Sequence, residues 1–207
     1  MERPAKNITW NGARITWLSG LAFILLLVGA VGSGCSTREA SASSVDAKAQ
    51  VARGAYLVTI GGCNDCHTPW KMGPNGPEPD ASRLLSGHPE SYKITAAGAA
   101  PSGQWQGAAL MAGTNTAFSG AWGVSFTANL TPDRNTGIGI WTEDMFIKTI
   151  RSGRHWGVSR PILPPMPWFN YRQMTDEDLK AVYAYLRSIP PVVNHVPDPL
   201  PPVETTH

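Results

Sequence analysis

The sequence predicts a mostly helical domain with a long irregular stretch between its first helix and the later ones. Apolar residues recur at helical spacing in three separate segments, and few segments alternate with the period of a strand. The chain also contains 18 Pro and 21 Gly residues, which are spread through its middle and interrupt regular structure there. At 207 residues it has room for one domain able to bury a core.

The first helix is expected between Asp46 and about Ile60, because apolar residues there recur at i, i+4, i+8 and i+11. These are Ala47, Val51, Ala55 and Val58. Gly61 and Gly62 end the pattern. Gly54 lies inside it and costs about 1 kcal/mol relative to Ala, which indicates a place where another backbone comes close.

The irregular stretch covers residues 68–127, where Pro and Gly separate several Trp residues and no repeat is found. A structureless loop of that length is uncommon inside a domain. We therefore expect an extended segment that packs its aromatic side chains on the rest of the domain, with short pieces of helix or strand whose positions the sequence does not indicate.

Two more helices are expected after this stretch. Thr142 precedes two acidic residues and an apolar stripe that ends at Gly153. Thr175 precedes three acidic residues and a second stripe that ends at Pro190. Residues 46–196 are expected to form the domain, followed by a Pro-rich, peripheral tail over 197–207.

The motif with the clearest chemistry is Cys63-Asn64-Asp65-Cys66-His67, whose spacing is typical of c-type haem attachment. Two thiols at this spacing form thioethers with the haem vinyl groups, and the adjacent His67 can offer its imidazole to the iron. The chain contains this motif once, so the sequence predicts one covalently bound haem c.

Two other uses of the motif are less favoured. A redox-active Cys-X-X-Cys would be expected after a strand in a βαβ unit, and the flanking residues do not provide one. A structural zinc site would need a fourth ligand and normally a second pair, whereas the remaining cysteine, Cys35, lies in a different kind of segment.

Residues 1–35 have the features of a leader for export. Basic residues as far as Arg14 precede residues 15–34, which carry no charge. Three outcomes stay open: lipidation of Cys35 in a box that resembles that of bacterial lipoproteins, cleavage after Ala42, or retention as a membrane anchor. All three place the domain on the periplasmic side, after a flexible spacer over 36–45. The formal charge of +2 gives no indication of nucleic-acid binding.

The second axial position of the iron decides between electron transfer and small-molecule chemistry. Met166 is the preferred ligand because prolines on both sides restrict its backbone and leave little freedom to lose on binding. His155 is the alternative, although it could equally serve a helix end or a haem carboxylate, for which Arg154, Trp156 and Arg160 are further candidates. Met111 is a further candidate. Met145 fits helix packing better, Met174 lies beside the cap of the last helix, and Met72 is too close to His67 in the chain. His88 and His195 are expected to be exposed.

Several stretches carry a resemblance to a known family over about residues 51–191. They are 54–58 before the haem motif, Asn129-Leu130-Thr131-Pro132-Asp133 with Thr136-Gly137-Ile138-Gly139, Pro164-Pro165-Met166-Pro167, and 178–186. The sequence resembles class I c-type cytochromes, in the branch that includes cytochrome subunits of membrane-bound alcohol and sugar dehydrogenases.

The resemblance implies a cytochrome c fold in which the first and last helices cross at Gly54, around one haem held by Cys63, Cys66, His67 and Met166. The stretch 68–127 is then a long Gly/Pro-rich insert. The implied function is that of a non-enzymatic, single-electron carrier between a dehydrogenase and an oxidase or another cytochrome. The alternatives are a haem subunit of a larger dehydrogenase complex and a haem protein whose open or labile distal site acts on a small molecule.

Overall fold

The computed structural model describes residues 34–95 and 110–202, with backbone alone at 34–45 and at 110. The chain divides into two compact units, Met1–Val45 and Asp46–His207, and apart from the start of the first helix all the features discussed below lie in the second unit. The predicted leader and the side chain of Cys35 lie outside the described residues. Of the helices that the structure describes, none has the length and apolarity needed to cross a bilayer.

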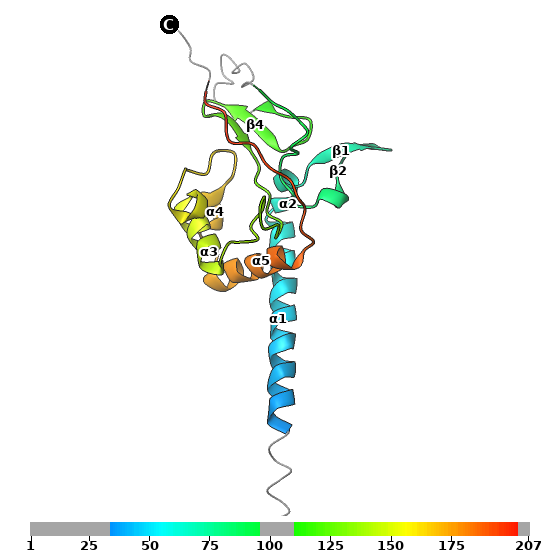
Figure 1. The fold of residues 1–207 in the computed structure, drawn as a ribbon, viewed down its shortest axis with the longest axis vertical. Coiled ribbons are helices and arrows are strands. Elements are labelled where there is room, and N and C mark those ends of the chain that lie inside the picture. The colour runs from blue at the N-terminus through cyan, green and yellow to red at the C-terminus, as the bar shows by residue number, and fades with distance from the viewer. Residues whose placement is uncertain (1–33, 96–109, 203–207) are drawn as a thin grey trace, which may run out of the picture. The chain divides into compact units, whose positions relative to one another are not determined.

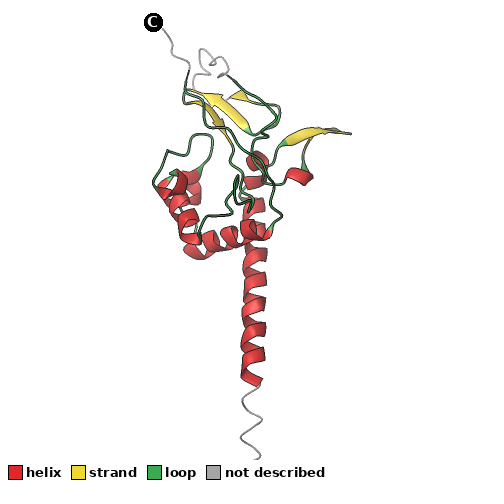
Figure 2. Cartoon of the chain, viewed as in Figure 1, coloured by secondary structure: helices red, strands yellow, loops and turns green. Residues whose placement is uncertain are grey.

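The domain contains five α-helices, five short strands and single 3-10 turns among its described residues (Figures 1 and 2). The helices are α1 (Gly34–Ile60), α2 (Cys63–His67), α3 (Glu143–Ser152), α4 (Trp168–Tyr171) and α5 (Asp176–Ser188). The strands are β1 (Trp70–Gly73), β2 (Gly76–Pro79), β3 (Leu110–Met111), β4 (Ala117–Gly120) and β5 (Gly123–Phe126).

Helix α1 begins earlier than expected and presents a shifted face. The predicted spacer 36–45 is helical, which is consistent with the absence of Gly and Pro between residues 36 and 53. Within the second unit, Ala47 of the predicted stripe is exposed, whereas Leu57, which the stripe omitted, is buried beside Val58.

The two later helices confirm the capping predictions. The Thr142 and Thr175 side chains accept hydrogen bonds from the backbone N–H groups of Met145 and Asp178, so each caps its helix. Helix α3 ends at Gly153, whose φ of 65° is the left-handed conformation that glycine adopts without strain.

All five described strands lie in the predicted insert and form two small antiparallel sheets. Strands β1 and β2 pair as a hairpin from Trp70 opposite Pro79 to Gly73 opposite Gly76. Strands β3, β4 and β5 form the second sheet in chain order. The insert therefore contains more strand than the sequence indicated, and its residues 96–109 lie outside the described part.

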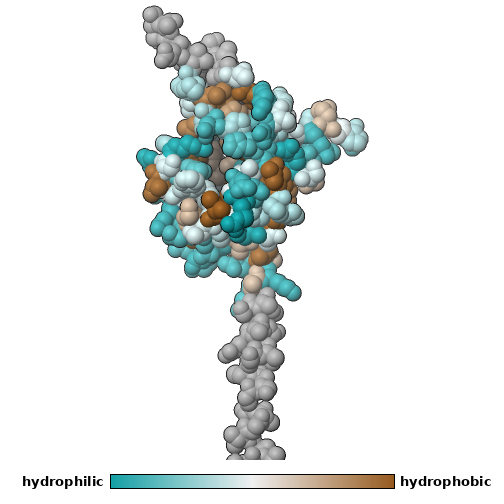
Figure 3. Space-filling model, in the orientation of Figure 1, coloured by the Kyte–Doolittle hydropathy of each residue, from teal (hydrophilic) through white to brown (hydrophobic). Residues whose placement is uncertain are grey.

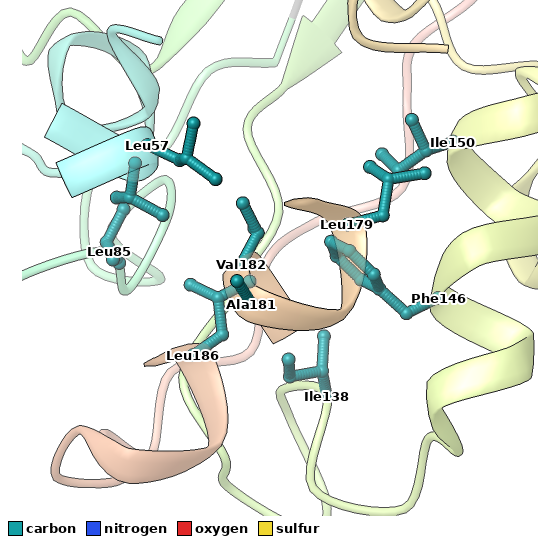
Figure 4. Close-up of a cluster of buried hydrophobic side chains, with 10 residues drawn as sticks. Leu57, Leu85, Ile138, Phe146, Ile150, Leu179, Ala181, Val182 and Leu186 are labelled. Carbon is teal, nitrogen blue, oxygen red and sulfur yellow. The ribbon is translucent and has the colours of Figure 1, made fainter. Parts of the chain in front are cut away.

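The core forms where α5 crosses the end of α1. A Cβ placed on Gly54 would lie 1.9 Å from the Ala181 carbonyl oxygen, so only glycine allows this approach of the two backbones. Side chains of α5 lie between those of α1 and α3 in Figure 4. The buried apolar set is Leu57, Val58, Leu85, Ile138, Phe146, Ile150, Leu179, Ala181, Val182 and Leu186.

The segment after α5 returns across the domain and is held by Asn194, which is 2% exposed. Its side-chain amide donates to the carbonyls of Ser86 (2.7 Å) and His88 (2.8 Å). Its oxygen accepts from Arg83 Nη2 (2.8 Å) and the Glu90 N–H (2.9 Å). All the hydrogen-bonding capacity of this amide is thus used to join the C-terminal segment to the insert.

The predicted tail is also more involved in the fold than expected. Leu200 pairs with Val124 of β5, with its N–H 3.0 Å from the Val124 oxygen and its own oxygen 2.9 Å from the Val124 N–H. A boundary at residue 196 is therefore too early, because the backbone groups of Leu200 are satisfied by the sheet.

Replacing Asn194 by Ala is expected to lower the free energy of unfolding by about 3 kcal/mol, because buried carbonyls and N–H groups lose their partners. Chemical denaturation followed by circular dichroism measures the change. Asn170→Ala is the control, since Asn170 is exposed on α4, and it is expected to stay within about 0.5 kcal/mol of the unmodified protein. Equal stabilities of the two variants would contradict the role given to Asn194.

Candidate haem site

The three residues of the attachment motif lie together on the short helix α2. Gly62, with φ 67°, is in the left-handed conformation at the N-cap of α2, which separates α2 from α1. Because α2 is helical, Cys63 and Cys66 are three residues apart on one face. The motif follows a helix rather than a strand, so the context expected of a redox-active dithiol is not found.

The electrostatics of the two thiols also argue against dithiol chemistry. Burial raises the pKa of Cys63 to about 11. Burial, and then the charge of Asp65, raise the pKa of Cys66. Redox-active cysteines need a lowered pKa to be thiolates at neutral pH, and these two stay protonated.

One ring nitrogen of His67 is hydrogen-bonded to the backbone, and the other is free to ligate a metal. It is 7% exposed, and its Nδ1 lies 2.8 Å from the Ala128 carbonyl oxygen. A carbonyl only accepts, so Nδ1 carries the proton and donates, which leaves the lone pair of Nε2 for a metal. Burial lowers the pKa of His67, and the Ala128 carbonyl opposes this in part. The neutral form, which ligates metals, is therefore favoured at pH 7.

The position of Ala128 is fixed by a segment that runs between it and the motif. The Gly87 N–H donates to the His67 carbonyl (2.8 Å), and the His88 N–H donates to the Thr127 carbonyl (3.0 Å). A Cβ on Gly87 would lie 2.4 Å from the Thr127 oxygen, and its φ of 76° is left-handed, so this close approach needs glycine. The insert thus supplies the support for the carbonyl that orients His67, and Ala128 itself follows directly after the insert. The sequence analysis did not identify this arrangement.

Met166 lies half-buried in the loop that precedes α4. The structure connects this loop to the motif through Tyr171 of α4, whose hydroxyl donates to the Gly61 carbonyl at 2.5 Å, two residues before Cys63. Figure 3 shows the surface hollowed between the segment of α3 and α4 and the central loops beneath β4. Tyr171 was not singled out from the sequence, because its partner is 110 residues away.

The other candidate ligands are distributed around the fold. Met72 and Met111 are 77% and 62% exposed on strands of the insert. His155 is half-buried against the ring of Trp141, 5.4 Å away. The expectation that His88 is exposed was wrong: its relative exposure is 0%, and its ring nitrogens contact Thr116 Oγ1 (2.9 Å) and the Tyr92 carbonyl (2.8 Å). The ring of Phe126 at the end of β5 lies 4.8 Å from its ring, so side chains of distant parts of the insert enclose it.

Comparison with known proteins finds similarity to cytochrome subunits of dehydrogenases. No family model matches the chain. It is 27% identical over 168 residues to the fructose dehydrogenase cytochrome subunit of Gluconobacter japonicus, which covers 81% of the chain and 26% of that protein. It is 31% identical over 146 residues to the alcohol dehydrogenase (quinone) cytochrome c subunit of Komagataeibacter europaeus, which covers 69% of the chain and 25% of that protein.

The chain is similar to cytochrome c subunits of dehydrogenases. A third such relative is the gluconate 2-dehydrogenase cytochrome c subunit of Pantoea cypripedii, 39% identical over 74 residues that cover 34% of the chain and 16% of that protein. The chain therefore spans about a quarter, or less, of the length of these cytochrome c subunits.

The residues around the motif fit the haem that the motif predicts. Within residues 34–95 and 110–202, the buried Trp70 Nε1 and Arg83 Nε have no hydrogen-bond partner. Haem carries two carboxylates, which are the kind of acceptor that these donors lack. The sequence analysis named Arg154, Trp156 and Arg160 for this role, but all three are exposed, and Arg154 Nη1 donates to the Ser159 carbonyl. Trp70 and Arg83, whose buried donors have no partner in the described part of the chain, are therefore added as candidates for this role.

Proposed function

We propose that the chain is a c-type cytochrome that carries single electrons through one haem c, bound by thioethers to Cys63 and Cys66 and ligated by His67. The observation that carries this proposal is the 2.8 Å contact between His67 Nδ1 and the Ala128 carbonyl. It sets the ring orientation and the tautomer that an iron ligand requires. A haem supplies iron that alternates between the ferric and ferrous states, and the residues of the chain hold, bury and orient it.

The proposed fold is that of class I cytochromes c, with crossed N- and C-terminal helices and the loop insert. The approach of Gly54 to Ala181, where α1 and α5 cross, supports this assignment. Met166 is the proposed distal ligand. Its proline-flanked loop is ordered by contacts on both sides, so a weak thioether ligand is offered with little loss of conformational freedom.

The proposed setting is that of an electron-transfer subunit, rather than a catalytic one, that serves a dehydrogenase. The cytochrome c subunits named above, from fructose, gluconate and alcohol dehydrogenases, support a dehydrogenase as the electron donor. We propose an oxidase or another cytochrome as acceptor, and export of the domain with a tether at Cys35 or in the leader. Contacts between redox partners are commonly small and transient, which suits a mobile or loosely bound carrier.

The test of this function uses the haem-loaded full chain. We expect one haem per chain from the pyridine haemochrome spectrum and a potentiometric titration that fits one electron. We also expect weak carbon monoxide binding to the ferrous protein, because the sixth position is filled. Tight carbon monoxide binding by the unmodified protein would overturn the carrier assignment in favour of an open distal site.

Replacing Met166 by Ala is expected to abolish the near-infrared sulfur-to-iron band of the ferric protein and to lower the reduction potential by on the order of 0.1 V, because a thioether favours the ferrous state. Met145→Leu is the control, since Met145 is half-buried on α3 and the change conserves volume. Survival of the band in Met166→Ala would exclude Met166 as the ligand.

A further inference from the structure

The loop that carries Met166 is anchored on both sides by hydrogen bonds from side chains far away in the sequence. Upstream, the Ser125 hydroxyl donates to the Pro164 carbonyl at 2.5 Å. Downstream, the Tyr171 hydroxyl donates to the Gly61 carbonyl at 2.5 Å. The first anchor connects the loop of Met166 to the sheet of β3, β4 and β5, which is called the inserted sheet below. The second connects the loop to the turn before the haem motif.

In the upstream anchor, the Ser125 hydroxyl donates to the Pro164 carbonyl in preference to its other possible acceptor. Ser125 is 8% exposed on β5, and its hydroxyl has a single proton to donate. The Pro164 oxygen is much closer to it than the Phe118 oxygen, 2.5 Å against 3.4 Å. The Ser125 oxygen also accepts from Trp122 Nε1 at 3.3 Å, so the hydroxyl is oriented from within the sheet. Pairing of β5 with β4 and with Leu200 makes the sheet a firm support.

The downstream anchor connects the loop to the haem-binding turn itself. Tyr171 is the last residue of α4, and its N–H contacts the Pro167 carbonyl at 3.4 Å, so α4 transmits its position to the residue next to Met166. Gly61 is held in turn on α1, with its N–H 2.9 Å from the Leu57 carbonyl. A Cβ on Gly61 would lie 3.6 Å from the Tyr171 ring and 3.8 Å from Cys63 Sγ, which places the ring close to the attachment site.

We infer that Ser125 and Tyr171 are positioning residues that clamp the loop of Met166, and that supporting this loop is a role of the sheet formed by β3, β4 and β5. The inference rests on the proposed ligation by Met166. A thioether is a weak ligand, so a loop that is already ordered before ligation suppresses the open state of the iron more strongly than a mobile loop would. Each lost anchor raises the population of the open state.

The experiment measures carbon monoxide affinity of the ferrous, haem-loaded full chain in Ser125→Ala, Tyr171→Phe and the double variant. A hydrogen bond of ordinary strength corresponds to about a fivefold change in the open population, and the apparent affinity for carbon monoxide rises in proportion. We expect about fivefold tighter binding in each single variant and about 25-fold in the double variant if the anchors act independently.

Two control variants lose comparable hydrogen bonds elsewhere. Tyr183→Phe removes a hydroxyl that donates to the Trp141 carbonyl at 2.6 Å, and Thr149→Val removes a buried hydroxyl on α3 that donates to the Met145 carbonyl at 2.8 Å. Both are expected to stay within about twofold of the unmodified protein in carbon monoxide affinity. Ser125→Thr keeps a hydroxyl and is expected to retain the carbon monoxide affinity of the unmodified protein.

If Ser125→Ala does not accumulate with haem, Ser125→Cys replaces it. The thiol is a weaker donor than the hydroxyl, so carbon monoxide affinity is again expected to rise.

The outcomes separate this inference from the proposed function. Absence of the sulfur-to-iron band in the unmodified protein would overturn Met166 ligation itself. A band that is present, together with carbon monoxide affinities of the Ser125 and Tyr171 variants equal to those of the controls, would leave ligation in place and overturn the clamp.

Discussion

A chain in which Cys63 and Cys66 are both replaced by Ser is expected to retain no haem after denaturation and extraction with acidified solvent. Serine hydroxyls do not form the thioether bonds, so only axial ligation, by His67 and the proposed ligand Met166, would hold the group, and both contacts are lost on unfolding. The measurement is haem absorbance of the chain on a denaturing gel, together with its mass. The expected effect is complete loss, against one haem mass in the unmodified chain.

The matched control is Cys35→Ser, which removes the third thiol and lies outside the attachment motif. It is expected to keep the covalent haem. Each single variant, Cys63→Ser or Cys66→Ser, keeps one thioether position and is expected to show intermediate loading. Haem that remains covalently bound to the double variant would contradict the assigned attachment.

Replacing Gly54 by Ala is expected to lower the free energy of unfolding by at least about 3 kcal/mol. In an unconstrained helix the change would stabilise by about 1 kcal/mol, because Ala is the better helix former. Here the new methyl group would lie 1.9 Å from the Ala181 carbonyl oxygen and 2.8 Å from Tyr185 Cβ. Backbone atoms cannot rotate away as a side chain can, so α1 and α5 would have to separate.

The control for this substitution is Gly113→Ala, because nothing lies within 4 Å of a Cβ at that position. It is expected to change stability by no more than about 0.5 kcal/mol. Denaturant unfolding of both haem-loaded variants measures the difference. A Gly54→Ala protein as stable as the unmodified one would show that the two helices can part without cost, contrary to the packing described.

The helices were predictable where local rules decide their limits. Thr142 and Thr175 cap α3 and α5 because a hydroxyl that accepts a backbone N–H acts within three residues of its own position. Gly153 ends α3 for the same local reason. The buried face of α1 was harder to predict. Leu57 is buried and Ala47 is exposed because α5 covers only the end of α1, and a stripe in the sequence does not say where its partner begins and ends.

The candidate site also has a part that was predictable from adjacent residues and a part that depends on contacts between distant ones. The Cys63 to His67 motif could be recognised from adjacent residues, since the chemistry of attachment depends on their spacing. The acceptor of His67 Nδ1 lies 61 residues further along the chain, and the two anchors of the Met166 loop join residues 39 and 110 positions apart. His88 was expected to be exposed from its Pro-flanked position, and the sheet that encloses it is formed by distant segments.

The sequence by itself therefore determined the attachment motif, the capped helices, the need for glycine at position 54 and the resemblance to class I cytochromes c, because each depends on residue type and short spacing. Tertiary structure alone decided that the Gly/Pro-rich insert forms sheets, that Ala128 orients His67, that Asn194 joins the C-terminal segment to the insert, and that Ser125 and Tyr171 hold the loop of Met166. These contacts depend on which backbone groups meet after folding, and hydrogen-bond partners of that kind have no signature in the local order of residues.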